Sequence, residues 1–175
     1  SVPVEVNFES SNLPIVIIET AQGQEIPNDP KIDATMQIIF KGDGERNFLS
    51  DVNDPTALDY DGAIKIEYRG STSSLLDKKQ YAFTPYDDSG EKVNEGFLDM
   101  PKENDWILNG LAYDPSFIRD FISYRLSNLT GNYASRGRYC EVILNGDFRG
   151  IYILQEKLKP DDSRIDINKI KPEDL

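Results

Sequence analysis

The sequence has no histidine and only one cysteine, Cys140, among its 175 residues. The lack of histidine excludes a Ser-His-Asp or Cys-His catalytic triad and a histidine-ligated metal site. A single cysteine excludes an intrachain disulfide, a cysteine zinc site and a Cys-x-x-Cys redox pair. Cys140 lies within an apolar run, so we expect it to be an unreactive core residue.

Positive charge and long apolar runs are also scarce. The chain has 19 Lys and Arg against 31 Asp and Glu, which gives a formal net charge of −12. This balance disfavours nucleic acid or an anionic membrane surface as a partner. Apolar runs such as residues 15–18 fall far short of the ~20 residues that span a bilayer, so no membrane-spanning segment is predicted.

The remaining composition is that of a folded domain. Hydrophobic residues make up 38% of the chain, which is enough for a core. At about 150 residues per domain, the length predicts one domain. We expect residues 1–12 to be a linker or arm, residues 13–160 to be the folded unit and residues 161–175 to be a charged tail.

Apolar patterning predicts strands separated by polar loops. Residues 63–69 alternate apolar and polar side chains, which is typical of a half-buried strand. Residues 41–62 are rich in Gly, Asp, Asn and Pro, and predict a long loop. The other predicted strands are residues 13–20, 34–40, 79–86, 105–110, 139–144 and 148–154, and Asn145-Gly146 predicts a hairpin turn between the last two.

One principal helix is predicted. Asp114 is a candidate N-cap, Pro115 suits the first helical position, and Gly131 is a plausible stop. Apolar residues then recur at helical spacing on one face: Phe117, Ile118, Phe121, Ile122, Leu126 and Leu129. Strands without regular alternation with helices predict an α+β fold with a mainly antiparallel sheet.

The best candidate binding residues follow the strand that ends at Arg69. The loop residues Gly70, Ser71, Thr72 and Ser73 offer backbone amides and hydroxyls, and Lys78 and Lys79 follow them. Such groups could bind a phosphate, because amides and hydroxyls donate hydrogen bonds while Lys and Arg neutralise charge. The alternative is a solvated hairpin loop with two surface lysines. The pattern is not a P-loop.

Three other groups are weaker candidates. Arg119 could reach a phosphate or an acidic partner, or be a surface charge, while Asp114 could simply cap the helix. Glu156, at the end of the last strand, could line a ligand cleft or be a polar terminus. The acidic stretch 51–61 lacks the Gly and the closing Glu of an EF-hand loop, so no metal ligand is assigned.

Several of these segments together resemble the CotH kinase family, named after a spore coat protein. The likeness covers nearly the whole chain, in matching order and spacing. It is carried by residues 66–73, 78–83, 100–108, 114–119, 133–136, 141–146, 150–152 and 156–157.

The resemblance implies the N-terminal lobe of an atypical protein kinase-like fold. Family members use ATP and Mg²⁺ to phosphorylate serine residues of proteins. By this likeness, residues 70–74 would cover the phosphates, Lys79 or else Lys78 would contact them, and residues 154–157 would face adenine. Arg119 stands where a kinase has a helix glutamate, which is a departure from ordinary kinases.

The resemblance also places the metal-binding and catalytic carboxylates beyond Lys157. Asp161, Asp162 and Asp166 lie too close to the predicted sheet for that role, so no catalytic residue is assigned to this chain. We expect the chain to be inactive alone and to pair with a C-terminal lobe that it lacks.

Two functions therefore stay open. One is a nucleotide-binding lobe of an ATP-dependent protein serine kinase. The other is a non-catalytic surface or adhesion module for a protein or glycan, which the exposed-looking Tyr60, Tyr86 and Tyr113 would suit. The resemblance also implies export, to a bacterial cell surface or the extracellular space.

Overall fold

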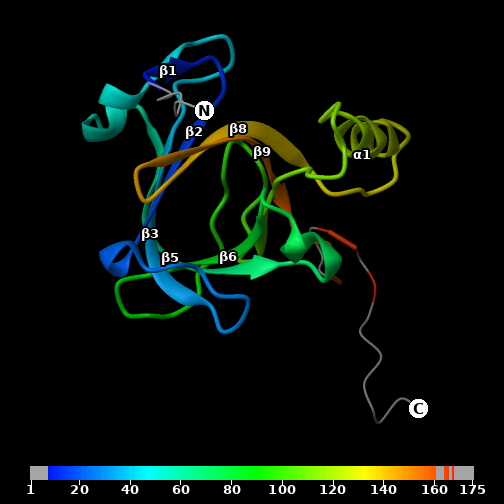
Figure 1. The fold of residues 1–175 in the computed structure, drawn as a ribbon. Coiled ribbons are helices and arrows are strands. Elements are labelled where there is room, and N and C mark those ends of the chain that lie inside the picture. Colours follow the sequence, from blue (N-terminus) through cyan, green and yellow to red (C-terminus); the bar gives the residue numbers. More distant parts are fainter. Residues whose placement is uncertain (1–7, 161–163, 166, 168–175) are drawn as a thin grey trace, which may run out of the picture.

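The computed structural model describes residues 8–160, 164, 165 and 167. Seven strands within this part of the chain form a closed barrel, in the order β2-β3-β5-β6-β7-β9-β8 (Figure 1). The barrel strands are β2 (Ile15–Thr20), β3 (Ile32–Ile39), β5 (Leu58–Arg69), β6 (Gln80–Tyr86), β7 (Trp106–Asn109), β8 (Gly137–Leu144) and β9 (Asp147–Glu156).

Several short strands and helices are not part of the barrel sheet. β1 (Ser10–Ser11) pairs with β4 (Asn47–Phe48) in a separate two-stranded sheet, so part of the predicted arm is a strand. Three 3₁₀ helices occupy connections, η1 (Ala21–Gly23), η2 (Leu49–Asn53) and η3 (Thr72–Leu75), and one α-helix, α1 (Arg119–Leu129), precedes β8. No helix among the described residues is long and apolar enough to cross a membrane.

The predicted α+β fold resembling a kinase N-terminal lobe is wrong, because the sheet closes on itself. β2 pairs in parallel with β8, with Ile15 opposite Glu141 and Ile18 opposite Leu144. All the other barrel pairings are antiparallel. The pairing that closes the barrel joins segments near opposite ends of the chain, and local periodicity carries no information about it.

The predicted loop 41–62 is also partly wrong. It contains β4 and η2, and β5 begins at Leu58 rather than at residue 63. The apolar residues of this stretch, including Leu49 and Val52, pack outside the barrel. They form a satellite cluster with Ile15, Ile39, Ala57 and Ile143. Because these apolar residues are few and separated by polar ones, they show no strand periodicity.

Large aromatic and aliphatic side chains fill the barrel. Trp106, at 0% exposure, meets Phe97 edge to face with 4.9 Å between ring centroids. Phe97, Leu98 and Met100 come from the connection between β6 and β7 and belong to the same core cluster. Cys140 is fully buried, as predicted, and burial raises the pKa of its thiol to about 12.

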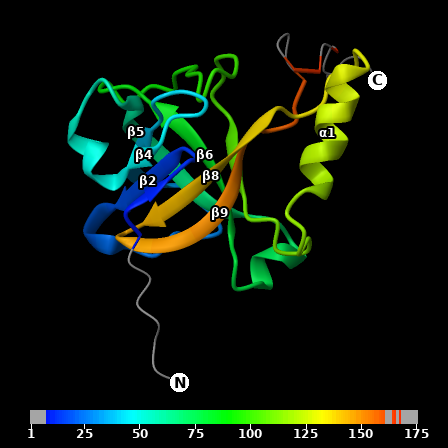
Figure 2. The same ribbon diagram turned by 90° about the horizontal axis from the view of Figure 1, so that it is seen from above.

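The predicted hairpin is confirmed, but the predicted helix starts too early. Asn145 and Gly146 have φ of 50° and 77° in the β8–β9 turn. α1 begins at Arg119, four residues after Pro115, and Asp114 accepts a 2.9 Å hydrogen bond from the Arg119 amide without being the N-cap. α1 stands beside the barrel (Figure 2), and none of its residues is buried.

Tyrosines inside the barrel predict a loss of stability in alkali. Burial raises the pKa of Tyr81 to about 12, above about 10 in the unfolded chain. Stability from this residue is therefore complete below pH 10 and is lost as the pH rises toward 12, by about 2–3 kcal/mol. Urea unfolding followed by circular dichroism at several pH values should show this decline.

The Tyr81→Phe variant isolates the contribution of this residue. Its free energy of unfolding should fall less steeply above pH 10 than that of the unmodified chain. Identical slopes for the two proteins would contradict the prediction.

Of the three tyrosines expected at the surface, Tyr113 is 64% exposed, while the Tyr60 ring packs edge-on against Phe97 at 5.0 Å.

Candidate functional site

A cavity of about 530 Å³ brings together three of the residues singled out in the sequence, Arg69, Arg119 and Glu156. It lies where β5 and β9 end and where the loop before α1 begins. The remaining lining residues are Gln80, Ile107, Asn109, Leu111, Ala112, Tyr113, Asp114, Asp120, Tyr124, Gln155, Lys157 and Leu158.

Two arginines from separate elements supply positive charge to this cavity. Arg69 is the last residue of β5, and its Nη1 lies 3.4 Å from Oε1 of Gln80. Burial lowers the pKa of the Arg69 guanidinium, which still stays charged at neutral pH. Arg119 is the first residue of α1, and its side chain is 75% exposed. Both can therefore meet an anion in the cavity.

Asp114 organises the loop that carries Arg119. Its carboxylate accepts hydrogen bonds from the Ser116 hydroxyl at 2.6 Å and from the Arg119 amide at 2.9 Å. These bonds hold the pKa of the carboxyl below its usual value. Leu111 and Phe117 in the same loop have φ of 52° and 59°, a region that bulky residues rarely adopt. Asp114 thus fixes a strained loop before the helix, although it is not the N-cap itself.

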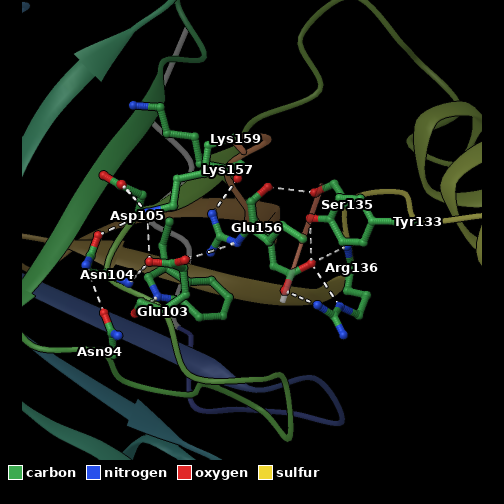
Figure 3. A network of polar contacts seen from close by, with 12 residues as sticks. Asn94, Glu103, Asn104, Asp105, Tyr133, Ser135, Arg136, Glu156, Lys157 and Lys159 are labelled. Carbon is green, nitrogen blue, oxygen red and sulfur yellow. Dashed lines mark hydrogen bonds and ion pairs between the residues drawn. The ribbon is translucent and has the colours of Figure 1, made fainter. Parts of the chain in front are cut away.

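Glu156 lines the cavity, but its carboxylate is already bound. Arg136 contacts it with two guanidinium nitrogens, at 2.9 and 2.8 Å, and with its backbone amide at 3.0 Å (Figure 3). The Tyr133 hydroxyl donates a further bond at 3.2 Å. Glu156 is 0% exposed, so this bidentate pair anchors the end of β9. Sequence reasoning missed Arg136 as its partner.

The lysines of the predicted phosphate loop do not line this cavity. Nζ of Lys78 lies 3.2 Å from the Arg149 carbonyl oxygen and 4.5 Å from the ring centroid of Tyr152. Burial lowers the pKa of Lys78. Nζ of Lys79 lies 5.8 Å from the ring centroid of Tyr68. Nζ of Lys78 also lies 5.5 Å from the ring centroid of Phe117, so it is near the loop before α1. Of the predicted loop group, Arg69 lines the cavity, whereas Lys78, Lys79 and residues 70–73 do not.

A second ion network, not found from the sequence, holds the chain after β9 (Figure 3). Nζ of Lys159 lies 2.8 Å from Oε1 of Glu103 and 2.9 Å from Oδ2 of Asp105. Arg164 is buried, with Nε 3.8 Å from Oε2 of Glu103, and it donates to the Lys157 carbonyl oxygen. These contacts tie Lys157, Lys159 and Arg164 to the segment just before β7.

A larger cavity, about 730 Å³, lies between α1 and the barrel. Tyr124 and Gln155 belong to the linings of both cavities, so the two adjoin. Apolar side chains line much of the larger one, among them Leu13, Phe40, Leu98, Met100, Phe121, Leu129, Tyr139 and Ile153. Of the apolar residues at helical spacing, Phe121 and Leu129 line this cavity.

No group of three or more Asp, Glu, Cys or His residues able to hold a metal occurs among the described residues. In the acidic stretch, Asp51 pairs with Lys41 at 2.8 Å, and Asp54 accepts a bond from the Thr56 amide. Asp59 accepts a bond from the Leu98 amide at 2.9 Å. Asp161, Asp162 and Asp166, considered from the sequence, lie outside the described residues.

Comparison with known proteins gives one match. A family model described as CotH kinase protein matches residues 66–172, which is more than half of the chain. The matched range includes Arg69, Arg119 and Glu156. A search of curated proteins finds no match.

Proposed function

The chain belongs to the CotH kinase protein family, and on that premise we propose that it binds ATP for phosphoryl transfer to serine residues of a protein. The observation that supports this proposal is the pair of arginines, Arg69 and Arg119, on one cavity. Lys157 adds a third cationic side chain to the lining. The Arg69 guanidinium donates to the Gln80 side-chain oxygen and not to a carboxylate, whereas Arg119 pairs with Asp114 at 3.6 Å.

Phosphoryl transfer is catalysed mainly by positioning and by neutralising charge on the phosphates. Guanidinium groups suit this task because they stay charged and donate paired hydrogen bonds to phosphate oxygens. Two such groups on different elements would hold the triphosphate from two sides. The lining as a whole has three cations, Arg69, Arg119 and Lys157, and three carboxylates, Asp114, Asp120 and Glu156, so it is neutral in a chain of net charge −12. Lys79, Lys78 and residues 70–73, which do not line the cavity, stay predicted contacts.

The described residues do not fit a magnesium site, because they hold no cluster of three carboxylates. We therefore assign no Mg²⁺ ligand and derive no step through the ion. When bound to ATP, Mg²⁺ neutralises the β- and γ-phosphates. The proposal therefore concerns the surface that binds the phosphates, and not the metal site.

Calorimetric titration with ATP and Mg²⁺ tests the proposal. Arg69→Ala and Arg119→Ala should each weaken binding about tenfold or more, since a hydrogen bond to a charged group contributes about 1.5–3 kcal/mol. Lys102→Ala is the control, because Lys102 is 72% exposed and lines neither cavity. Its affinity should equal that of the unmodified chain.

Affinity unchanged in both arginine variants would overturn the assignment of this cavity. If Lys79→Ala alone abolished binding, the phosphates would lie at the barrel end near Tyr68 instead. A chain that binds no nucleotide, but binds a glycan or a surface protein, would favour the non-catalytic module.

A further inference from the structure

Lys78 lies in the connection between β5 and β6, but its ammonium group contacts two other parts of the fold. Its Nζ donates a hydrogen bond to the Arg149 carbonyl oxygen of β9 at 3.2 Å and lies 4.5 Å from the ring centroid of Tyr152. It also lies 5.5 Å from the ring centroid of Phe117, which precedes α1. Because aromatic rings attract a cation at this distance, Lys78 links Phe117 to β9.

The alkyl stem of the same lysine lies beside Gly110, which directly follows β7. Gly110 is buried, and a methyl group in its place would lie 2.9 Å from the Lys79 carbonyl oxygen and 3.2 Å from Cγ of Lys78. Only glycine therefore allows the chain to pass so close to this lysine. We call the connection between β7 and α1 the 110–118 loop. Lys78 is near its first residue and contacts Phe117 near its end.

The 110–118 loop leads directly into Arg119, one of the two arginines proposed to bind phosphate. Phe117 has φ of 59°, which a phenylalanine rarely adopts, so contacts must hold it there. Its amide donates to the Asp114 carbonyl oxygen at 2.9 Å, and its carbonyl oxygen accepts a hydrogen bond from the Tyr139 hydroxyl. These bonds hold its backbone, while the ammonium group of Lys78 lies over its ring.

We propose that Lys78 positions Arg119 for phosphate binding by holding the 110–118 loop against the barrel. Arg119 lines the cavity of about 530 Å³, whereas Lys78 does not. The Arg119 side chain is 75% exposed, so its place depends on the backbone that carries it and little on packing of its own. The inference rests on the proposed function. It gives Lys78 an indirect role in place of the direct phosphate contact predicted from the sequence.

Calorimetric titration with ATP and Mg²⁺ separates the indirect role from a direct one. Lys78→Met keeps an unbranched stem without the charge, and should weaken binding about fivefold, as expected for one lysine–aromatic contact. In the Arg119→Ala chain the same substitution should have no further effect, because the group that Lys78 positions is gone. Lys78→Arg restores a cation over the rings and should regain most of the affinity. Equal losses from Lys78→Met in both backgrounds would show a direct contact and overturn the proposal.

Amide hydrogen exchange in the free protein, followed by NMR, tests the loop contact without nucleotide. The amides of Phe117 and Arg119 both donate to Asp114 at 2.9 Å, so both should be protected in the unmodified chain. Lys78→Met should speed their exchange about fivefold, because the loop opens more often when the ring contact is lost. Lys78→Arg should leave both rates near those of the unmodified chain.

Lys65→Met is the matched control for both measurements. Nζ of Lys65 lies 4.8 Å from the ring centroid of Tyr86, so this variant loses a similar contact away from the 110–118 loop. Its ATP affinity and its exchange rates in the loop should not change. Unchanged exchange in Lys78→Met would overturn the positioning role and leave the proposed function standing. Faster exchange in Lys78→Met, with no ATP binding by any of the proteins, would overturn the proposed function and with it the role in phosphate binding.

Discussion

Replacing Arg136 with methionine should lower the free energy of unfolding by about 3–5 kcal/mol. The reason is the position of its partner, because the Glu156 carboxylate has 0% side-chain exposure and receives three hydrogen bonds from Arg136. The backbone bond would survive in the variant, but the two guanidinium bonds would not. Removing the guanidinium leaves a buried negative charge with the Tyr133 hydroxyl as its remaining side-chain donor. Chemical denaturation followed by circular dichroism measures the loss.

Arg149→Met is the matched control for this prediction. Arg149 and Asp147 form a pair at 3.3 Å whose side chains are 44% and 76% exposed. Exposed pairs contribute about 0–1 kcal/mol, so this variant should unfold almost like the unmodified chain. The double variant Arg136→Met, Glu156→Met should recover part of the lost stability, because it removes the stranded charge. Equal losses in Arg136→Met and Arg149→Met would contradict the burial argument.

Trp106→Ala should cost a similar amount, about 3–5 kcal/mol, for a different reason. Trp106 lies at the centre of the barrel, where it meets Phe97 at 4.9 Å and donates its indole N–H to the Glu103 carbonyl oxygen at 2.8 Å. The guanidinium of Arg164 lies 5.6 Å from the centroid of its ring. Truncation would leave a large cavity beside a buried cation and would remove one of the two hydrogen bonds to the Glu103 carbonyl oxygen, which also accepts from the Glu95 amide at 3.0 Å.

Trp106→Phe separates volume from polarity in this site. The smaller aromatic ring keeps most of the packing but loses the hydrogen bond, so its cost should lie clearly below that of alanine. Tyr113→Ala is the surface control, because Tyr113 is 64% exposed and its loss should change stability by no more than about 0.5 kcal/mol. Urea denaturation of the three variants, followed by far-ultraviolet circular dichroism, gives the comparison. A cost for Trp106→Ala near that of Tyr113→Ala would show that the barrel interior is not close-packed.

The local elements could be predicted from the sequence where a chemical signal marked them. Asn145-Gly146 predicted the β8–β9 turn because both positions need positive φ, which they have. Alternation over residues 63–69 predicted the second half of β5, in which Ile64 and Ile66 are buried. The first half escaped notice because Asp59, Asp61 and Gly62 are residue types that are depleted in strands, although Leu58 and Tyr60 alternate with the two aspartates.

The arrangement of these elements could not be predicted in the same way. Periodicity predicted a helix with one apolar face, yet Leu126 and Leu129 stay exposed. An apolar face indicates that a helix packs against a partner, but it does not identify that partner. Similarly, no local pattern links β2 to β8, since closure is decided by the fit of the whole barrel.

In the candidate site, too, residues marked by a local signal were predicted and their long-range partners were not. Arg69 and Arg119 were found because each ends or begins an element, and the fold brings both to one cavity. The partners of Glu156 and Lys159 were missed, since Arg136 and Glu103 are far from them in the sequence. The Ser-rich loop after Arg69 looked like a single phosphate site with Lys78, but Nζ of Lys78, which precedes β6, lies 4.5 Å from the ring centroid of Tyr152.

The parallel seam between β2 and β8 has a consequence for biosynthesis. β2 emerges early from the ribosome, and one of its edges has no partner until residues 141–144 are made. The barrel can therefore close only late, and pairings between such distant segments fold slowly. Until then β2 presents an open, Ile-rich edge that can recruit strands from other chains. A chain stopped before β8 would leave this edge exposed permanently and should accumulate as aggregate.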